Sequence, residues 1–480
     1  MIGRLAVRSL TAHPIRSAVL AAGFGVGVSV MAILLGVAEV VLDQARSPSL
    51  VGGGDVVLRI GPQVPARLVL SGTLQADALR DRVLVAAPWH TSDLFLVKND
   101  GTTAALSVRG GIPSLERALG DPETDTAGWQ DTAADAAWTR VSPAESLRLI
   151  DAFHPVPDAP EWADSWAEWL YFNGRAGGAQ FYLTFMVGPP DADGLRPAGV
   201  RLQLDRGGRM ESYSASAKLT QADVDRAPEL SIAGNHVRLD GLRYIVELDL
   251  AGRGGVRAAG TVTIDAEPGR LLPPIQISGA RGWLTGYVVP VMSGRLGGAL
   301  RVGGAIVSFA GGTGYHDHNW GFWRGVSWQW GQVQHGGRSF LYGRVFPPPE
   351  AADAERLPGF LGVLGPDGPQ GFATNVRITE QNDARGLPQA ILVRGRGPTV
   401  DITLHFDVQS REVTRMPEGP LANNVDFLQM RGTYTVSGRA GDERVDFTAP
   451  GSAETFRSTE GAHPGARAPV PEALRREPRR

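Results

Sequence analysis

Residues 312–322 read GTGYHDHNWGF and combine two histidines, an aspartate, an asparagine and a tryptophan in one short stretch. The whole chain of 480 residues has 9 histidines, so two of them one residue apart call for an explanation. Successive side chains of a β-strand point to opposite faces. As a strand, the stretch would present two sets of side chains: His316, His318 and Trp320 on one face, and Tyr315, Asp317 and Asn319 on the other.

Strand patterns continue on both sides of this stretch, from residue 154 to residue 457. In residues 244–249, YIVELD, largely apolar and polar positions alternate, which indicates one buried and one solvated face. Many short segments of this kind, joined by glycine, aspartate and asparagine turns, are typical of β-sandwiches and β-barrels. We therefore predict a mainly β protein with two closed barrels in tandem, over residues 154–298 and 299–457.

The remaining segments differ from these strands in composition. Residues 43–153 mix short strand and helix patterns and carry no motif to which we assign chemistry. Residues 458–480 are basic and proline-rich, which predicts a disordered tail.

The N-terminus contains an uncharged apolar run, residues 17–38, preceded by Arg4, Arg8 and Arg16. A helix of this length spans a hydrocarbon core of about 30 Å. We predict a transmembrane helix over residues 17–42, with residues 1–16 in the cytoplasm and the bulk of the chain periplasmic, because basic residues favour the cytoplasmic side. A cleaved signal peptide is the alternative, but its apolar region is usually shorter and a small-residue cleavage site follows it.

Charge and cysteine content exclude several classes of function. The net charge is −3 and the pI is about 6.3, so there is no basic surplus for binding nucleic acid. The chain has no cysteine, which excludes disulfides, thiolate metal sites and cysteine nucleophiles.

Three hypotheses account for the histidines of residues 312–322. As metal ligands, His316 and His318 would need a third ligand, and the candidate is His335 on the expected return strand. No acidic or histidine pattern accompanies His335, so we expect neither a metal nor any other cofactor. As catalytic groups, a histidine and an aspartate beside aromatic rings can move a proton and stabilise a cation. As structural groups, the histidines would form hydrogen bonds inside a barrel.

A second aromatic cluster lies at residues 162–173, WADSWAEWLYFN. Packing at the base of a barrel is one interpretation of its rings. In the other, Glu168 and Asn173 supply polar groups to an aromatic-lined cavity.

These motifs together resemble the carotenoid 1,2-hydratases (hydroxyneurosporene synthases) and the AttH-type lipocalin-like proteins. The resemblance covers residues 154–457 and rests on four segments: EWLYFNG (168–174), YHDHNWG (315–321), SWQWGQV (327–333) and SFLYGRVF (339–346). It implies tandem lipocalin-like barrels and cofactor-free chemistry on an isoprenoid. It also implies functional roles for His318, Trp320 and Tyr342, while Arg344 stands where the family has an acid. The first 60 residues or so separately resemble the start of ABC-transporter permeases of the macrolide-exporter and lipoprotein-release type.

From these observations we predict a membrane-anchored protein that binds a hydrophobic, isoprenoid- or lipid-like ligand. Hydration of a carbon–carbon double bond, a non-catalytic carrier role beside an ABC exporter, and an isoprenoid or pericyclic cyclase remain open. The predicted catalytic residues are His318, Trp320, Tyr342 and Asp317. The predicted ligand-binding residues are His316, Asn319, Trp323, Trp328, Trp330, Glu168, Trp169, Tyr171, Asn173 and Arg344.

Overall fold

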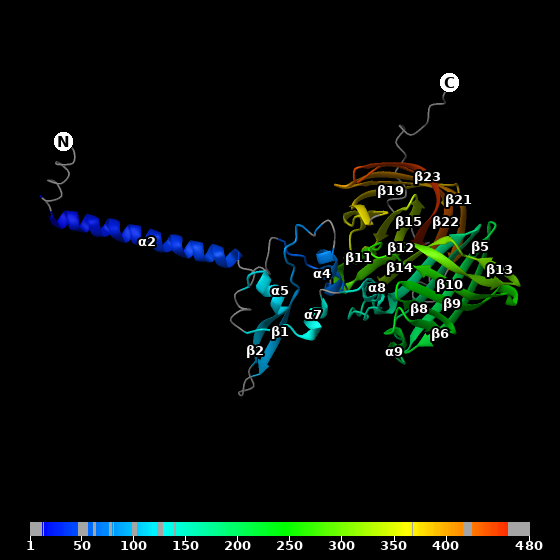
Figure 1. Cartoon of the computed structure of the whole chain (residues 1–480), viewed down its shortest axis with the longest axis horizontal. Helices are drawn as coiled ribbons and strands as arrows, with labels where there is room; N and C mark the ends of the chain where they lie inside the picture. The colour runs from blue at the N-terminus through cyan, green and yellow to red at the C-terminus, as the bar shows by residue number, and fades with distance from the viewer. Residues whose placement is uncertain are drawn as a thin grey trace, which may run out of the picture. The chain divides into compact units, whose positions relative to one another are not determined.

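The computed structural model describes most of the chain in two separate compact units, residues 1–141 and 142–480. The described residues are 12, 14–46, 56–60, 64–75, 79, 81–97, 103–121, 128–138, 141–366, 368–415 and 425–458. The predicted tail, apart from Ser458, and nearly all of the predicted cytoplasmic segment lie outside the described residues. Figure 1 shows the elements of each unit in sequence colours.

Among its described residues, the first unit holds an apolar helix, three further helices and a two-stranded antiparallel sheet. The apolar helix α2 (Pro14–Arg46) is longer than the predicted span, and its residues 14–35 are long and apolar enough to cross a membrane. The other elements are α4 (Ala66–Gln75), β1 (Trp89–Val97), β2 (Thr103–Gly111), α5 (Pro113–Ala118) and α7 (Ala133–Trp138). Residues 43–153 are predicted from the sequence as one mixed segment, but α8 (Pro143–Asp151), near its end, belongs to the second unit.

The second unit begins with α8 and continues as two large antiparallel sheets. The first sheet contains β3 (Trp166–Ala176), β4 (Ala179–Val187), β5 (Arg196–Arg206), β6 (Arg209–Leu219), β7 (Leu230–Ile232), β8 (Asn235–Asp240), β9 (Arg243–Gly252), β10 (Arg257–Asp265), β11 (Leu272–Ser278), β12 (Leu284–Val302), β13 (Ala305–Ser308) and β14 (Gly312–Phe322). The short helix α9 (Gln221–Val224) lies between β6 and β7 in sequence. Pairing of β10 with β9, and of β6 with β9, closes the ring β3-β4-β5-β6-β9-β10-β12-β14 into a barrel.

The second sheet has the order β18-β17-β16-β15-β23-β22-β21-β20-β19. Its strands are β15 (Ser327–His335), β16 (Arg338–Phe346), β17 (Phe360–Gly365), β18 (Gly368–Ala373), β19 (Asn375–Asn382), β20 (Pro388–Arg396), β21 (Val400–Arg415), β22 (Val425–Ala440) and β23 (Glu443–Ser458). No strand ladder joins its end strands β18 and β19 within the described residues, but only Thr374 separates them in the chain. The chain itself therefore connects the two ends of this nearly closed barrel, which surrounds its own apolar core.

The mainly β fold class and the two large sheets are as predicted, but the strand pairing differs from the predicted boundary at residues 298 and 299. Strand β14 pairs with β3 along its whole length, from Thr313 opposite Arg175 to Phe322 opposite Trp166. It therefore completes the first barrel, and the second sheet begins at β15. Sequence spacing alone could not detect this, because β14 pairs with a strand about 145 residues earlier in the chain.

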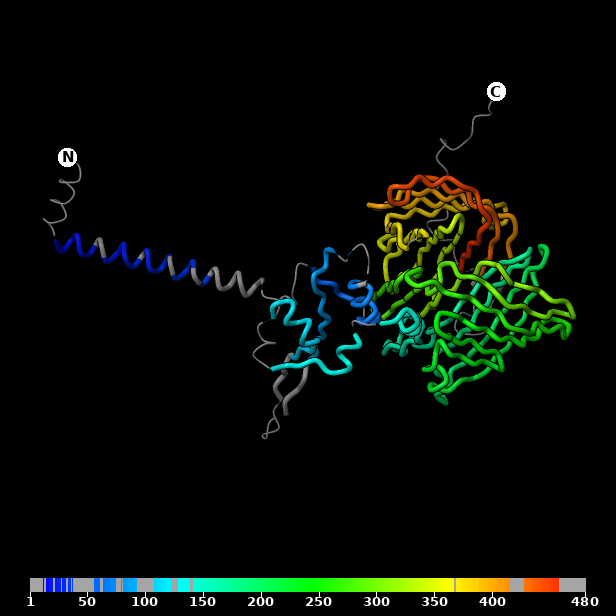
Figure 2. The backbone as a smooth tube through the Cα atoms, viewed as in Figure 1, coloured from blue at the N-terminus to red at the C-terminus, as the bar shows by residue number. Residues whose placement is uncertain are grey.

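The paired strands β3 and β14 are buried on both faces. The first nine residues of β3 are all buried, and in β14 every residue from Gly314 to Phe322 except Asn319 is buried. Antiparallel strands usually have one solvated face. Figure 2 shows the two sheets of the second unit as neighbouring layers of backbone. One face of the β3–β14 pair lines the interior of the first barrel, and residues of the other face line a cavity together with residues of the second sheet, so polar side chains on both faces need partners inside the protein.

We predict that Gly286→Ala lowers the free energy of unfolding by about 1–3 kcal/mol, since an added methyl group would overlap the indole of Trp320. Chemical denaturation of the purified variant measures the change. The matched control is Gly199→Ala, where the methyl group would meet only the carbonyl oxygen of Ala215, at 3.6 Å. Equal stability of the two variants would contradict the tight packing of Trp320.

Candidate functional site

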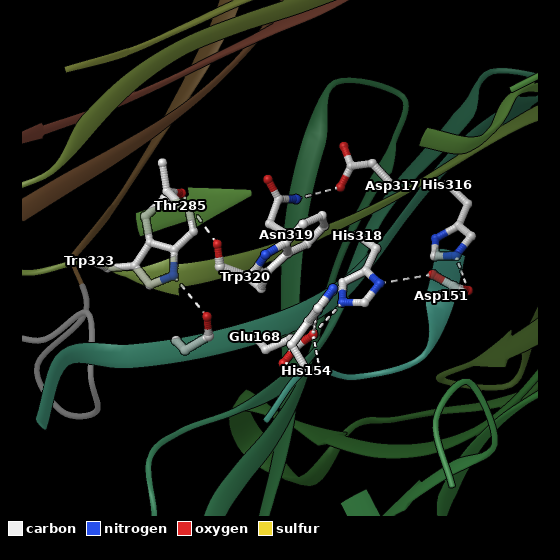
Figure 3. Close-up of polar contacts among 11 residues, drawn as sticks. Asp151, His154, Glu168, Thr285, His316, Asp317, His318, Asn319, Trp320 and Trp323 are labelled. Carbon is white, nitrogen blue, oxygen red and sulfur yellow. Dashed lines mark hydrogen bonds and ion pairs between the residues drawn. The ribbon is translucent and has the colours of Figure 1, made fainter. Parts of the chain in front are cut away.

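The two faces of β14 carry two different polar groups, and they lie apart. Figure 3 shows His316 and His318 on one side of the strand and Asp317 and Asn319 on the other. This is the alternation predicted from residues 312–322. The register of β14 against β3 determines which face looks into the first barrel.

On the inner face, two histidines and two carboxylates form one buried network with His154. Nε2 of His316 lies 2.8 Å from Oδ2 of Asp151, and Nδ1 of His318 lies 3.3 Å from the other oxygen of that carboxylate. Nε2 of His318 lies 2.8 Å from Oε1 of Glu168, which is also 2.7 Å from Nδ1 of His154. Each inner-face histidine is therefore held by at least one carboxylate.

Local sequence explains how Asp151 reaches this network. Ser142 caps α8 by accepting a hydrogen bond from the backbone N–H of Glu145, and proline occupies the first helical position. Leu147 and Ile150 are buried on the same helix, whose last residue is Asp151. The amphipathic face of α8 therefore carries the aspartate into the barrel.

The network sets the charge of its members. Burial lowers the pKa of His318, but hydrogen bonds and attraction from Asp151 and Glu168 outweigh burial and raise it to about 9. Burial raises the pKa of Glu168, but His154 and His318 outweigh burial and hold it below its usual value. The raised pKa favours the imidazolium form of His318, which the carboxylates of Asp151 and Glu168 flank.

Three of the predicted catalytic residues, His318, Trp320 and Tyr342, do not lie together and do not line one cavity. His318 and Trp320 are fully buried on the inner face of β14, where the indole of Trp320 stacks on His154 at 4.1 Å. Tyr342 lies in the core of the second sheet, with its hydroxyl 3.2 Å from that of Tyr434. Because side chains alternate between the two faces of a strand, His318 and Trp320 point into the first barrel, while Tyr342 points into the core of the second sheet.

A cavity of about 1330 Å³ lies between the two sheets, on the other face of β14. Eight of the predicted site residues line it: Trp169, Tyr171, Asp317, Asn319, Trp323, Trp328, Trp330 and Arg344. Six others do not: Glu168, Asn173, His316, His318, Trp320 and Tyr342. Asn173 lies elsewhere between the sheets, where it accepts a hydrogen bond from Gln332 at 2.8 Å.

One end of the cavity is a cluster of packed aromatic rings. The indoles of Trp169 and Trp323 lie 4.6 Å apart, and that of Trp323 lies 5.3 Å from Trp328. Trp328 in turn stacks on Phe456 of the last strand at 4.3 Å. Rings from both sheets therefore form one continuous apolar wall that suits a hydrophobic ligand.

Asp317 is a buried carboxyl on the wall of this cavity, surrounded by hydrogen-bond donors. The hydroxyl of Tyr315 donates to its Oδ2 at 2.9 Å, and the amide of Asn319 donates to its Oδ1 at 2.8 Å. The hydroxyl of Tyr287 lies 2.6 Å from that of Tyr315 and accepts a hydrogen bond from Trp330 at 2.9 Å. The chain of donors ends on the carboxyl group.

Glu454 on β23 is a second buried carboxyl in the cavity, and it is not among the predicted site residues. Its Oε1 accepts hydrogen bonds from the hydroxyl of Tyr171, at 2.5 Å, and from the amide of Gln429, at 3.4 Å. Nothing in its local sequence marks it as functional. Glu454 lies far from Asp317 in the chain, and it reaches the cavity because its strand β23 pairs with β15.

Both carboxyls hold their protons more tightly than exposed acids do. Burial raises the pKa of Glu454 to about 7, although the bonds from Tyr171 and Gln429 oppose the shift. Burial also raises the pKa of Asp317 well above its usual value; the bond from Tyr315 opposes this, and the nearby Glu454 adds to it. No cation pairs with either group in the described contacts, in contrast to the inner network.

Arg344 occupies the position where the resemblance implied an acid. Its Nη2 donates to the backbone carbonyl of Ala354 at 3.0 Å, and its guanidinium lies 4.8 Å from the ring centre of Phe346. It lines the cavity, where Asp317 and Glu454 are the buried acids.

One set of side chains in the described part of the chain could hold a metal ion: His154, Glu168 and His318, whose ligand atoms all lie within 4.8 Å of one another. His335, the third ligand considered from the sequence, instead stacks on Phe447 at 4.5 Å. His316 is held by Asp151 and the rings of Phe172 and Tyr244.

No protein-family model and no curated protein matches the sequence. Among solved structures the chain is similar to kievitone hydratase from Nectria haematococca, with 15% identity, a TM-score of 0.42, and coverage of 64% of this chain and 96% of that one. It is also similar to a putative AttH from Nitrosomonas europaea (13%, 0.40, 64% and 99%) and to CghA (13%, 0.40, 65% and 96%). CghA has also been solved with Sch210972. Likenesses of this size assign no function to the chain.

We predict that Glu454→Gln flattens the pH dependence of stability. The folded-state pKa, about 7, lies above the usual 4.5, so the folded chain binds more protons than the unfolded chain between these values. Stability conferred by the protonated group is therefore lost as pH rises from about 4.5 through 7, by roughly 3 kcal/mol. Urea unfolding across this pH range measures the decrease in the free energy of unfolding. We expect a smaller decrease in Glu454→Gln and an unchanged decrease in the exposed control, Glu350→Gln. Identical pH profiles for wild type and Glu454→Gln would contradict the assignment.

Proposed function

We propose that the chain binds a hydrophobic small molecule of isoprenoid or lipid type in the cavity between the sheets and acts on it by acid–base catalysis without a cofactor. The observation that carries this proposal is the pair of buried carboxyl groups, Asp317 and Glu454, on the wall of an aromatic-lined cavity. Buried acids without a cationic partner cost stability, and such groups concentrate at functional sites.

The size and lining of the cavity support the ligand class. Its volume of about 1330 Å³ exceeds the range of about 300–1000 Å³ for most small-molecule pockets, which favours a long ligand. The rings of Trp169, Trp323 and Trp328 provide apolar contact. Their π faces also attract cationic charge that develops during a reaction.

The favoured reaction is hydration of a carbon–carbon double bond. One carboxyl transfers its proton to an alkene carbon, and the electron pair of the double bond forms the new C–H bond. A water oxygen adds to the resulting cation, and the second carboxyl, ionised at that stage, takes the proton that the water releases. The donors Tyr315 and Asn319 stabilise the anion that Asp317 becomes when it acts as the acid.

Two other functions compete with hydration. A cyclase would use the same acid and cavity, but an intramolecular double bond would capture the cation in place of water. A carrier would use the aromatic wall alone, and the apolar helix at residues 14–35 would anchor it in the inner membrane beside an ABC exporter, with the two sheets in the periplasm.

We predict that Asp317→Asn and Glu454→Gln each lower turnover by about 10²–10⁴-fold, the usual contribution of a general acid or base. Purified wild type and variants are incubated with acyclic carotenoids and shorter isoprenoid alkenes, and products are analysed by mass for added water or for isomers. Ligand binding, measured by tryptophan fluorescence, changes little in these variants.

The matched controls separate binding from catalysis. The exposed Asp193→Asn keeps both activities, and Trp328→Ala, at the aromatic wall, weakens binding. A product of unchanged mass identifies a cyclase. Wild type that binds these ligands but converts none of them, like Asp317→Asn, contradicts the catalytic proposal and identifies a carrier.

A further inference from the structure

We propose that His154, Glu168 and His318 form a binding site for one divalent transition-metal ion, with zinc the best match. Their three ligand atoms converge within 4.8 Å of one another on the inner face of β14. Two imidazoles and a carboxylate are a ligand set that zinc uses in catalytic sites and that non-haem iron uses in oxygenases.

The distances require little movement to accept an ion. Oε1 of Glu168 lies 2.7 Å from Nδ1 of His154 and 2.8 Å from Nε2 of His318. Tetrahedral zinc with bonds of about 2.0–2.1 Å separates neighbouring ligand atoms by roughly 3.3 Å. The two pairs that share Oε1 of Glu168 therefore have to open by roughly half an ångström, which side-chain rotation can supply. The third pair, Nδ1 of His154 and Nε2 of His318, lies within 4.8 Å.

Further contacts hold the ligands in the orientation that a metal site needs. Metal-ligating histidines usually donate their second ring N–H to a carboxylate. Nδ1 of His318 lies 3.3 Å from Oδ1 of Asp151, on the side of the ring that this role requires. An ion at Nε2 would replace the proton that Nε2 shares with Glu168, and metal binding would release that proton. Oε2 of Glu168 accepts the backbone N–H of His154 at 3.0 Å, and the ring of His154 stacks on Trp320.

Burial and position indicate what the ion would do. The side chains of Glu168 and His318 are fully buried, while that of His154 is 12% exposed and provides the route of entry. His154 follows α8 by three residues, whereas Glu168 and His318 lie on β3 and β14. An ion there would connect the segment after α8 to the two central strands.

The site is independent of the proposed reaction, because it lies on the opposite face of β14 from Asp317 and does not line the cavity (Figure 3). Loss of metal and loss of catalysis can therefore be observed separately. The sequence analysis expected no metal because only His316, His318 and His335 were considered; His154 and Glu168 come from distant segments.

The test uses the full chain without a histidine tag, treated with chelator and dialysed. Zinc chloride is titrated by calorimetry, bound zinc is counted by elemental analysis, and melting temperature is measured with and without zinc. We expect one equivalent of zinc and a higher melting temperature. Cobalt(II) in place of zinc should give the visible absorption of a tetrahedral site with nitrogen and oxygen ligands.

Two variants and a control make the result specific. His154→Ala removes a ligand at the rim of the site and should weaken zinc binding by more than tenfold, and Asp151→Asn should weaken it by about 10–100-fold. His236→Ala, an exposed histidine on β8, should leave binding unchanged. Circular dichroism of metal-free wild type and His154→Ala verifies that both are folded.

Several outcomes would overturn the site. Folded wild type that takes up no zinc, iron or cobalt would mean that the network is only a hydrogen-bonded ion cluster. Zinc binding of equal strength in wild type and His154→Ala would place the ion elsewhere. Tight binding of iron(II) with none of zinc would keep the site and change its metal.

Discussion

The two-sided burial of the β3–β14 pair is the constraint on which the rest of the second unit depends. A strand with two buried faces distributes its side chains by parity alone, and a slip of one residue would exchange the two sets. The full ladder from Thr313 to Phe322 fixes that register. The histidines consequently complete the interior of the first barrel, while Asp317 faces the second sheet.

The alternation of side chains between the two faces also explains why the pKa values of these buried carboxyl groups shift in opposite directions. Asp151 and Glu168 face histidines, which hold the pKa of each carboxyl below its usual value despite burial. Asp317 and Glu454 face hydroxyl, amide and aromatic groups, and burial without a cation raises the pKa of each. The backbone of β14 thus lies between a network in which carboxylates pair with histidines and two acids whose raised pKa favours the neutral form.

Local pattern was sufficient to predict the β class, the alternation within residues 312–322 and eight of the residues that line the cavity. It was not sufficient for Asp151, His154 and Glu454, which reach their places through long-range pairing or helix docking and have no local signature. The family resemblance directed attention to His318 and Tyr342, whose side chains point into separate cores. The sequence predicted which side chains share a face within one strand. It did not predict which strand lies opposite, and so it did not predict which side chains from different strands meet.

The cavity exists only because the two sheets are docked, and the docking uses polar contacts at its margin. The hydroxyl of Tyr171 on β3 donates to Glu454 on β23. The amide of Gln180 on β4 donates to Ser452, which lies on β23 two residues before Glu454. Both strands are held in register by their own barrels, so these contacts position Glu454 relative to β14 without any flexible loop. An aspartate or glutamate at position 344, where this chain has arginine, would be positioned by the second sheet only. Asp317 on β14 and Glu454 on β23 are instead held by the two barrels separately, and the contact between Tyr171 and Glu454 connects the two frameworks.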